Sequence, residues 1–193
     1  MAPRNVRTTA GVIALSALLA ALTNPLPATA DGVVSNETEA MTIVDFDPQI
    51  AEQNGYRIER SAAGALISVP VSAEAIAEQR RTGAGRNTVS GNCGTATLTI
   101  TKNKARQGIN IQTSYVVKGT SLGHHWGVTG ATGVGKVYTE PFSGLTTGSH
   151  WSATHFKSVY GWSSGFGQID VGSFATLSNG AICHAGRATS NWG

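Results

Sequence analysis

Short segments of alternating apolar and polar residues dominate the second half of the chain. The segment TATLTIT at 95–101 alternates Ala, Leu and Ile with threonines, and INIQTSYVV at 109–117 alternates in the same way. Side chains along a strand point to opposite faces in turn, so this period of two predicts strands with one apolar face. Such strands can bury that face only against other elements or by closing on themselves.

More segments of this kind follow, separated by turn signals. Trp126 and Val128 begin a third predicted strand, and others are predicted at 137–142, 150–162, 168–177 and 181–185. Asn179-Gly180 predicts a type I′ hairpin turn between the last two, in which both central residues need positive φ. We therefore predict an all-β fold, an antiparallel β-sandwich or small barrel of about seven strands, preceded by a short α/β N-terminal segment.

Charge divides the chain near residue 87. Residues 31–87 carry a net charge of −4, whereas residues 88–193 carry +5 and 18 of the 24 glycines. We predict an acidic N-terminal segment or propeptide at 31–87 and a basic, disulfide-linked β domain at 88–193. The apolar residues of the acidic segment predict that it packs against the β domain, because a disordered tail would be poorer in them.

Three local elements are predicted within the acidic segment. Asp47 and Pro48 begin a short helix, which Gly55 ends. A hairpin around Ala63-Gly64 follows, and Ser72 then caps a second helix.

The first 30 residues have the pattern of a secretory signal peptide. Arg4 and Arg7 precede the apolar run GVIALSALLAAL at 11–22, and small residues stand at 28 and 30. This pattern predicts cleavage after Ala30 and an extracellular location. The run is shorter than the roughly 20 residues that a membrane-spanning helix needs, so we expect no integral membrane segment.

The two cysteines, Cys93 and Cys183, predict one disulfide in an exported protein. The bond would close a loop of roughly 90 residues and contribute up to about 4–5 kcal/mol to stability. It would join the first strand of the β domain to the last. We therefore expect neither a thiol nucleophile nor a cysteine metal ligand.

The stretch GATGVGKV at 130–137 is similar to a phosphate-binding loop. In such a loop Ser or Thr follows the lysine, and a helix then begins with its N-terminus facing the phosphates. Here Val137 follows Lys136, and the next residues favour a strand. We predict a glycine-rich hairpin loop, with no nucleotide and no other cofactor.

Residues suited to acid–base or metal chemistry are few in the basic domain. Glu140 and Asp170 are its two acidic residues, and both are predicted as solvated strand residues. His124 and His125 would point to opposite faces of a strand, as would His150 and His155. No catalytic residue and no metal ligand is assigned.

Aromatic residues give the candidate binding site. Trp126 and Trp151 are predicted to fill the core. Tyr160, Trp162 and Phe166 lie among Gly and Ser in YGWSSGFG at 160–167. Exposed rings on a β scaffold can stack on sugars, so these three are candidate ligand-binding residues. Their alternative role is to cover an edge of the core.

Three segments, FDPQIAEQNGYRI at 46–58, SGNCGTATLTI at 90–100 and NGAICHAG at 179–186, resemble a loose group of secreted proteins of high-GC Gram-positive bacteria. The resemblance implies secretion and a Cys93–Cys183 bridge, and it carries over no activity or site.

The leading functional hypothesis is a secreted, non-catalytic β-domain protein that binds an anionic or saccharide ligand, such as a cell-envelope polysaccharide or another polyanion. One alternative is a secreted hydrolase made as a zymogen, with residues 31–87 as its propeptide. Another is a secreted inhibitor or antibacterial toxin. Nucleic-acid binding is not expected, because the positive charge forms no basic helix or stripe.

Overall fold

The computed structural model describes residues 37–82 and 92–193. The chain divides into two units, residues 1–30 and 31–193, and every described residue belongs to the second. The predicted signal peptide lies outside the described residues. Within them, no helix is both long enough and apolar enough to cross a bilayer.

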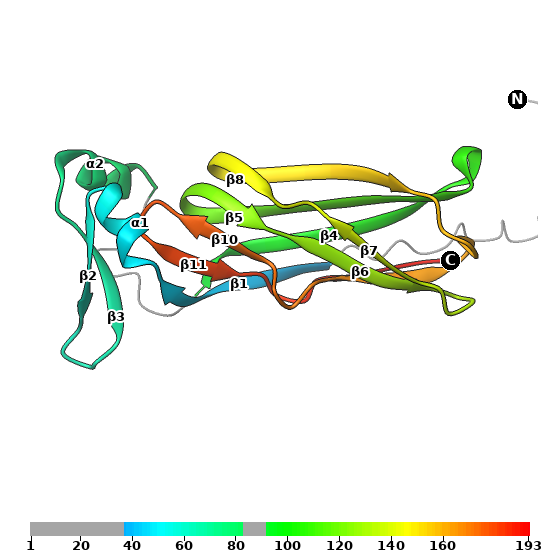
Figure 1. Cartoon of the computed structure of the whole chain (residues 1–193), viewed down its shortest axis with the longest axis horizontal. Helices are drawn as coiled ribbons and strands as arrows, with labels where there is room; N and C mark the ends of the chain where they lie inside the picture. Colours follow the sequence, from blue (N-terminus) through cyan, green and yellow to red (C-terminus); the bar gives the residue numbers. More distant parts are fainter. Residues whose placement is uncertain (1–36, 83–91) are drawn as a thin grey trace, which may run out of the picture. The chain divides into compact units, whose positions relative to one another are not determined.

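Five antiparallel strands form a closed barrel, which confirms the predicted all-β fold class. In sheet order they are β10 (Phe174–Leu177), β11 (Ala181–His184), β1 (Glu37–Phe46), β4 (Asn92–Asn103) and β5 (Gly108–His125). Strand β10 pairs with β5 as well as with β11, and this pairing closes the ring. A sixth strand, β8 (Gly144–Lys157), extends the sheet from β5 (Figure 1). We call these six strands the barrel sheet.

A second antiparallel sheet packs against the barrel sheet. Its order is β12 (Thr189–Trp192), β9 (Gly165–Ile169), β6 (Gly127–Thr132) and β7 (Val137–Pro141). Leu98 and Ile100 of β4 share one core cluster with Val128, Ile169 and Trp192 of this four-stranded sheet. The two sheets therefore bury one continuous core.

The local elements predicted for residues 46–82 are confirmed. They are α1 (Pro48–Gln53), β2 (Tyr56–Arg60), β3 (Leu66–Pro70) and α2 (Ala73–Thr82). The Asp47 carboxylate accepts the first backbone N–H groups of α1, at 2.9 and 3.0 Å. The Ser72 hydroxyl accepts the backbone N–H of Ala75 at 3.1 Å, which satisfies a donor in the first turn of α2.

The acidic segment also supplies a barrel strand that the sequence analysis missed. Strand β1 lies between β11 and β4, and Met41 and Ile43 are buried in the core. The same segment also contacts the turn between β10 and β11. The backbone carbonyls of this turn accept hydrogen bonds from Asp47 N at 2.8 Å and from Ser68 Oγ at 2.7 Å. The prediction that the segment packs against the β domain is therefore confirmed.

The single strand predicted at 168–177 is wrong. Strand β9 ends at Ile169 and β10 begins at Phe174, and the two belong to different sheets. A turn separates them, in which the Ser173 N–H donates to the Asp170 carbonyl at 2.9 Å. Because the apolar alternation continues across this turn, the sequence pattern hid the break. Asp170 is consequently a turn residue rather than a strand residue.

The turn at Asn179-Gly180 joins β10 to β11 as predicted, but its type differs. Of these two residues only Gly180 has positive φ, 81°. The Gly180 N–H donates to the Leu177 carbonyl at 2.9 Å, so Ser178 and Asn179 are the central residues. The loop therefore has three residues, with a left-handed glycine in its last position.

Two further predictions concern Cys93–Cys183 and the glycine-rich loop, and both are confirmed. The cysteines form a buried disulfide between β4 and β11, with Cα atoms 6.2 Å apart. Because β12 follows β11, the bond reaches the last strand but one. Residues 133–136 form the β6–β7 hairpin loop, closed by a 2.9 Å bond from Thr132 N to Lys136 O.

Candidate functional site

The outer face of the four-stranded sheet carries two rows of side chains that cross all four strands. Residues directly opposite each other on antiparallel strands share a face. The pairing register therefore aligns one row, Val137–Ala131–Phe166–Asn191, and beside it a second row, Thr139–Thr129–Gln168–Thr189. We call these eight residues the outer platform.

The outer platform is amphipathic and open to solvent. In its first row Val137 is 74% exposed and Phe166 is 47% exposed. In the second row, the hydroxyls of Thr129 and Thr139 lie 3.3 Å apart. Their neighbours along the strands, such as Tyr138 and Gly167, are buried. The platform thus places apolar surface beside a row of hydroxyl and amide groups.

Tyr160 stands beside the first row of the outer platform. Tyr160 is 77% exposed. It lines a shallow groove of about 370 Å³ together with residues of β7 and of the segment that follows β8: Lys136, Val137, Tyr138, Thr139, Lys157, Ser158 and Val159. Because Val137 belongs to both, the groove and the outer platform adjoin.

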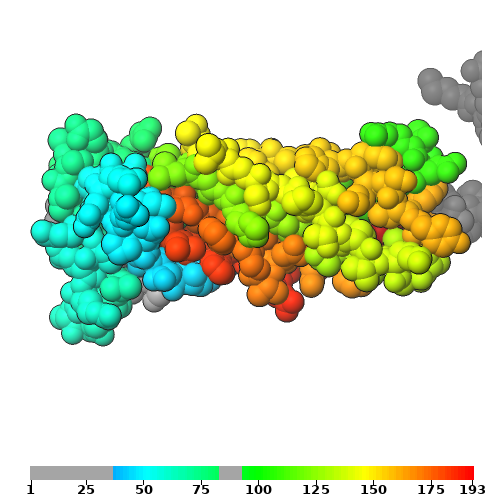
Figure 2. Space-filling view, in the orientation of Figure 1, coloured from blue at the N-terminus to red at the C-terminus, as the bar shows by residue number. Residues whose placement is uncertain are grey.

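The end of the β6–β7 hairpin contacts the segment after β8, which carries Tyr160. The Gly133 N–H donates to the Ser164 carbonyl at 2.8 Å. A side chain on Gly161 would collide with Val134, so a glycine is needed for this close approach. The two segments form adjoining surface in the space-filling view (Figure 2). The position of Tyr160 is thereby fixed relative to β7.

The three predicted ligand-binding residues do not form one group. Phe166 is exposed on the outer platform, and Tyr160 is exposed beside it. Trp162 is half-buried and packs against the core, and its carbonyl accepts the Trp192 indole N–H at 2.8 Å. Trp162 therefore anchors the segment that carries Tyr160 and has the core-covering role that the sequence left open.

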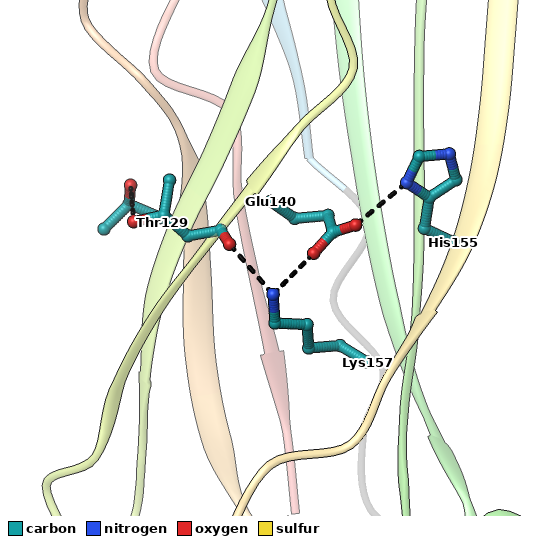
Figure 3. A network of polar contacts seen from close by, with 5 residues as sticks. Thr129, Glu140, His155 and Lys157 are labelled. Atoms are coloured by element: carbon teal, nitrogen blue, oxygen red, sulfur yellow. Dashed lines mark hydrogen bonds and ion pairs between the residues drawn. The ribbon is translucent and has the colours of Figure 1, made fainter.

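A charged network lies at the edge of the groove (Figure 3). The Lys157 ammonium donates to Glu140 Oε2 at 2.7 Å and to the Thr139 carbonyl at 3.1 Å. The second Glu140 oxygen, Oε1, lies 3.0 Å from His155 Nδ1. Glu140 therefore pairs with both neighbours from β8, and the sequence interpretation of it as a simply solvated strand residue was wrong.

The network sets the ionisation of Glu140. Burial tends to raise the pKa of this carboxyl, whose side chain is 16% exposed. The hydrogen bonds from Lys157 and His155 and the positive charge of Lys157 outweigh burial, and the pKa lies below its usual value. Glu140 is therefore ionised at neutral pH and compensates the charge of Lys157.

Lys136 differs from Lys157 in its environment. Its side chain is exposed on the β6–β7 hairpin, and it forms no ion pair with any residue in the described part of the chain. It lines the same groove as Lys157. The groove therefore has one uncompensated positive charge at neutral pH.

The two tryptophans predicted for the core, Trp126 and Trp151, pack against each other. Trp126 is buried and donates its indole N–H to Thr113 Oγ1 at 2.9 Å, and Trp151 is half-buried over it with ring centroids 5.8 Å apart. His124 is also buried here, and its Nε2 donates to the Phe142 carbonyl at 2.7 Å. Burial lowers the pKa of His124, against the effect of this bond, so its imidazole is neutral.

The remaining histidines bring no metal-binding group together. Across residues 37–82 and 92–193, no cluster of three or more His, Cys, Asp or Glu side chains could hold a metal ion. His125 is exposed, opposite to buried His124, as the strand alternation predicts. Its Nδ1 lies 3.2 Å from the Ser143 hydroxyl, and no described carboxylate contacts its other ring nitrogen.

Sequence reasoning missed most of the residues that accompany Tyr160 and Phe166. The lysines at 136 and 157, the valine at 137 and the threonines at 129 and 139 lie far apart in sequence from those aromatics. Their alternation within β6 and β7 was visible, but only the pairing register of the four strands places them together. Comparisons of this chain with protein-family models, with curated proteins and with solved structures find no match.

Proposed function

We propose that this protein is a secreted, non-catalytic domain that binds a saccharide of the cell envelope through the outer platform and Tyr160. The observation that carries the proposal is the row Val137–Ala131–Phe166, which places exposed apolar surface directly beside the threonine row. Sugars present apolar C–H faces and a rim of hydroxyls. A surface with both rings and hydroxyl groups matches them.

The secretion part of this proposal rests on the sequence. The arginines, apolar run and small residues of positions 1–30 predict a signal peptide. The buried Cys93–Cys183 disulfide suits an oxidising compartment. The envelope is accordingly the first place where an exported domain of this kind would meet polysaccharide.

The zymogen alternative is less consistent with the fold. Its propeptide, residues 31–87, would have to leave the mature enzyme. Strand β1 lies in that range and pairs with β4 on one side and β11 on the other. Its removal would open the barrel and expose the core that Met41 and Ile43 fill.

Co-sedimentation with purified bacterial cell walls that keep all their polysaccharides tests the proposal. Tyr160→Ala and Phe166→Ala should each weaken binding about tenfold, which corresponds to about 1.4 kcal/mol. The matched control is Val116→Ala, since Val116 is 50% exposed on the barrel sheet. It should bind as the wild type does. Equal binding by all four proteins, or binding by none, would exclude this saccharide function.

A further inference from the structure

We propose that the groove beside Tyr160 receives an acidic group of the saccharide, and that His155 adjusts its charge so that binding tightens on acidification. The inference rests on the proposed function and deepens it, since it names the class of ligand, an acidic saccharide, and a control on its binding. Its basis is that Lys136 and Lys157 line the groove, while Glu140 bonds to Lys157 and to His155 beside it.

The two lysines make the groove suitable for an anion. Lys136 and Lys157 both line it, from the β6–β7 hairpin and from the end of β8. Lys157 is held in place by the Glu140 carboxylate and the Thr139 carbonyl. An ammonium group has three N–H donors, so one is left for a ligand. The Lys136 side chain is exposed and forms no ion pair with a described residue, so it can turn toward the same acid group.

Glu140 limits this attraction at neutral pH. Its negative charge cancels that of Lys157, and with neutral His155 the three side chains sum to zero charge. Histidine is the side chain whose charge normally changes between pH 5 and 8. Because its Nδ1 contacts Glu140, protonation of His155 gives the three side chains a net charge of +1 beside the groove.

The residues paired with this network on the neighbouring strands carry no ionisable side chain. On β5, the residues opposite His155 and Lys157 are Ile111 and Ile109. On β6, the residue opposite Glu140 is Val128. The Phe142 ring stacks on the His155 ring with centroids 4.3 Å apart.

A competition experiment separates this inference from the proposed function. The full chain is bound to the purified cell walls, and soluble polymers then compete. Polygalacturonate presents carboxylates, its methyl ester presents the same backbone without charge, and a glycerol-phosphate polymer presents phosphodiesters. Both acidic polymers stay ionised at pH 5.5 and 7.5. The arms therefore distinguish acid from neutral sugar, and carboxylate from phosphate.

We expect at least one acidic polymer to compete better than the methyl ester. Its half-competing concentration should fall about threefold from pH 7.5 to 5.5, as one added charge several Å away would give in water. His155→Asn can still donate to Glu140 but does not titrate, so this pH effect should vanish. Lys136→Gln should weaken competition by the acidic polymer alone. Arg60→Gln, in the β2–β3 hairpin, removes the same charge elsewhere and should not.

Each other outcome is decisive. Equal competition by charged and uncharged polymers would overturn the acidic-group inference while leaving saccharide binding intact. An unchanged pH effect in His155→Asn would overturn the role of His155. If the wild type does not bind the purified walls at all, the proposed function itself fails.

Discussion

Cys93 and Cys183 lie on the two strands that flank β1, and their buried disulfide joins β4 to β11 with Cα atoms 6.2 Å apart. The bond therefore braces the barrel where the N-terminal strand enters it. It closes a loop with a sequence separation of 90 residues. Both the length of the loop and its position around β1 make it a large contribution to stability.

Replacing both cysteines, in Cys93→Ala/Cys183→Ala, should lower the free energy of unfolding by up to about 4–5 kcal/mol, the value for closing a loop of this length. Urea denaturation of the variant and the wild type measures the difference. Intact mass after alkylation without reductant is the control. Two freely alkylated thiols in the native protein would contradict the bridge.

A chain that begins at Thr88 should melt at a lower temperature than one that begins at Asp31. It lacks β1, so β4 and β11 lose their shared partner and the core loses Met41, Ile43 and Phe46. Apolar burial, at about 25 cal/mol per Å², is the cause rather than attraction between opposite charges. The gap should therefore persist in 1 M salt, and equal melting temperatures would refute the structural role of β1.

Glu78 of α2 attaches the helix to the barrel. Its carboxylate accepts bonds from Ser178 Oγ at 2.7 Å, from the Thr120 N–H at 3.3 Å and from the Tyr56 hydroxyl at 3.2 Å. Burial alone would raise the pKa of Glu78, but these bonds outweigh it and the pKa is lowered. The carboxylate is therefore stabilised in the folded state.

Glu78→Gln should destabilise the protein by about 1 kcal/mol at pH 6, a value reduced by the partial exposure of the site. Because the folded pKa is depressed, this stabilisation is complete above the unfolded pKa of about 4.3. It is lost as pH falls through the folded pKa. Urea unfolding at pH 6 and pH 3 should show the difference shrink. Glu74→Gln, on an exposed position of the same helix, is the control.

ATP with magnesium should not raise the melting temperature, and Lys136→Ala should change nothing in that assay. The loop at 133–136 joins two strands and offers no helix N-terminus to a phosphate. A site filled at 100 times its Kd would add about 2.7 kcal/mol. A shift that depends on Lys136 would contradict the hairpin interpretation.

Local chemistry made part of this fold predictable. Asp47 and Ser72 cap their helices through backbone N–H groups two or three residues further along the chain. Sequence alone therefore located α1 and α2. The alternation of β4 and the start of β5 also needed only local information. Strand β1 was not recognised because Glu37 and Glu39 place charge where apolar residues would continue its alternation.

The candidate site depended on long-range pairing. Tyr160 and Phe166 were visible as aromatics among small residues, but nothing local separates them from Trp162, which packs against the core. The contacts of Glu140 with His155 and Lys157 join β7 to β8 across the gap between two sheets. Such contacts follow from tertiary packing, which the sequence pattern of either strand does not contain.

The pairing of β1 with β11 also orders the events of folding. Ile43, near the beginning of the described chain, pairs with Cys183 near its end. Contacts so distant in sequence make folding slow, because the entropy of closing the chain is lost before they form. During synthesis the barrel can close only after residues 181–184 have emerged from the ribosome. Until then β1 lacks its partner β11, and an unpaired strand edge can pair with other chains.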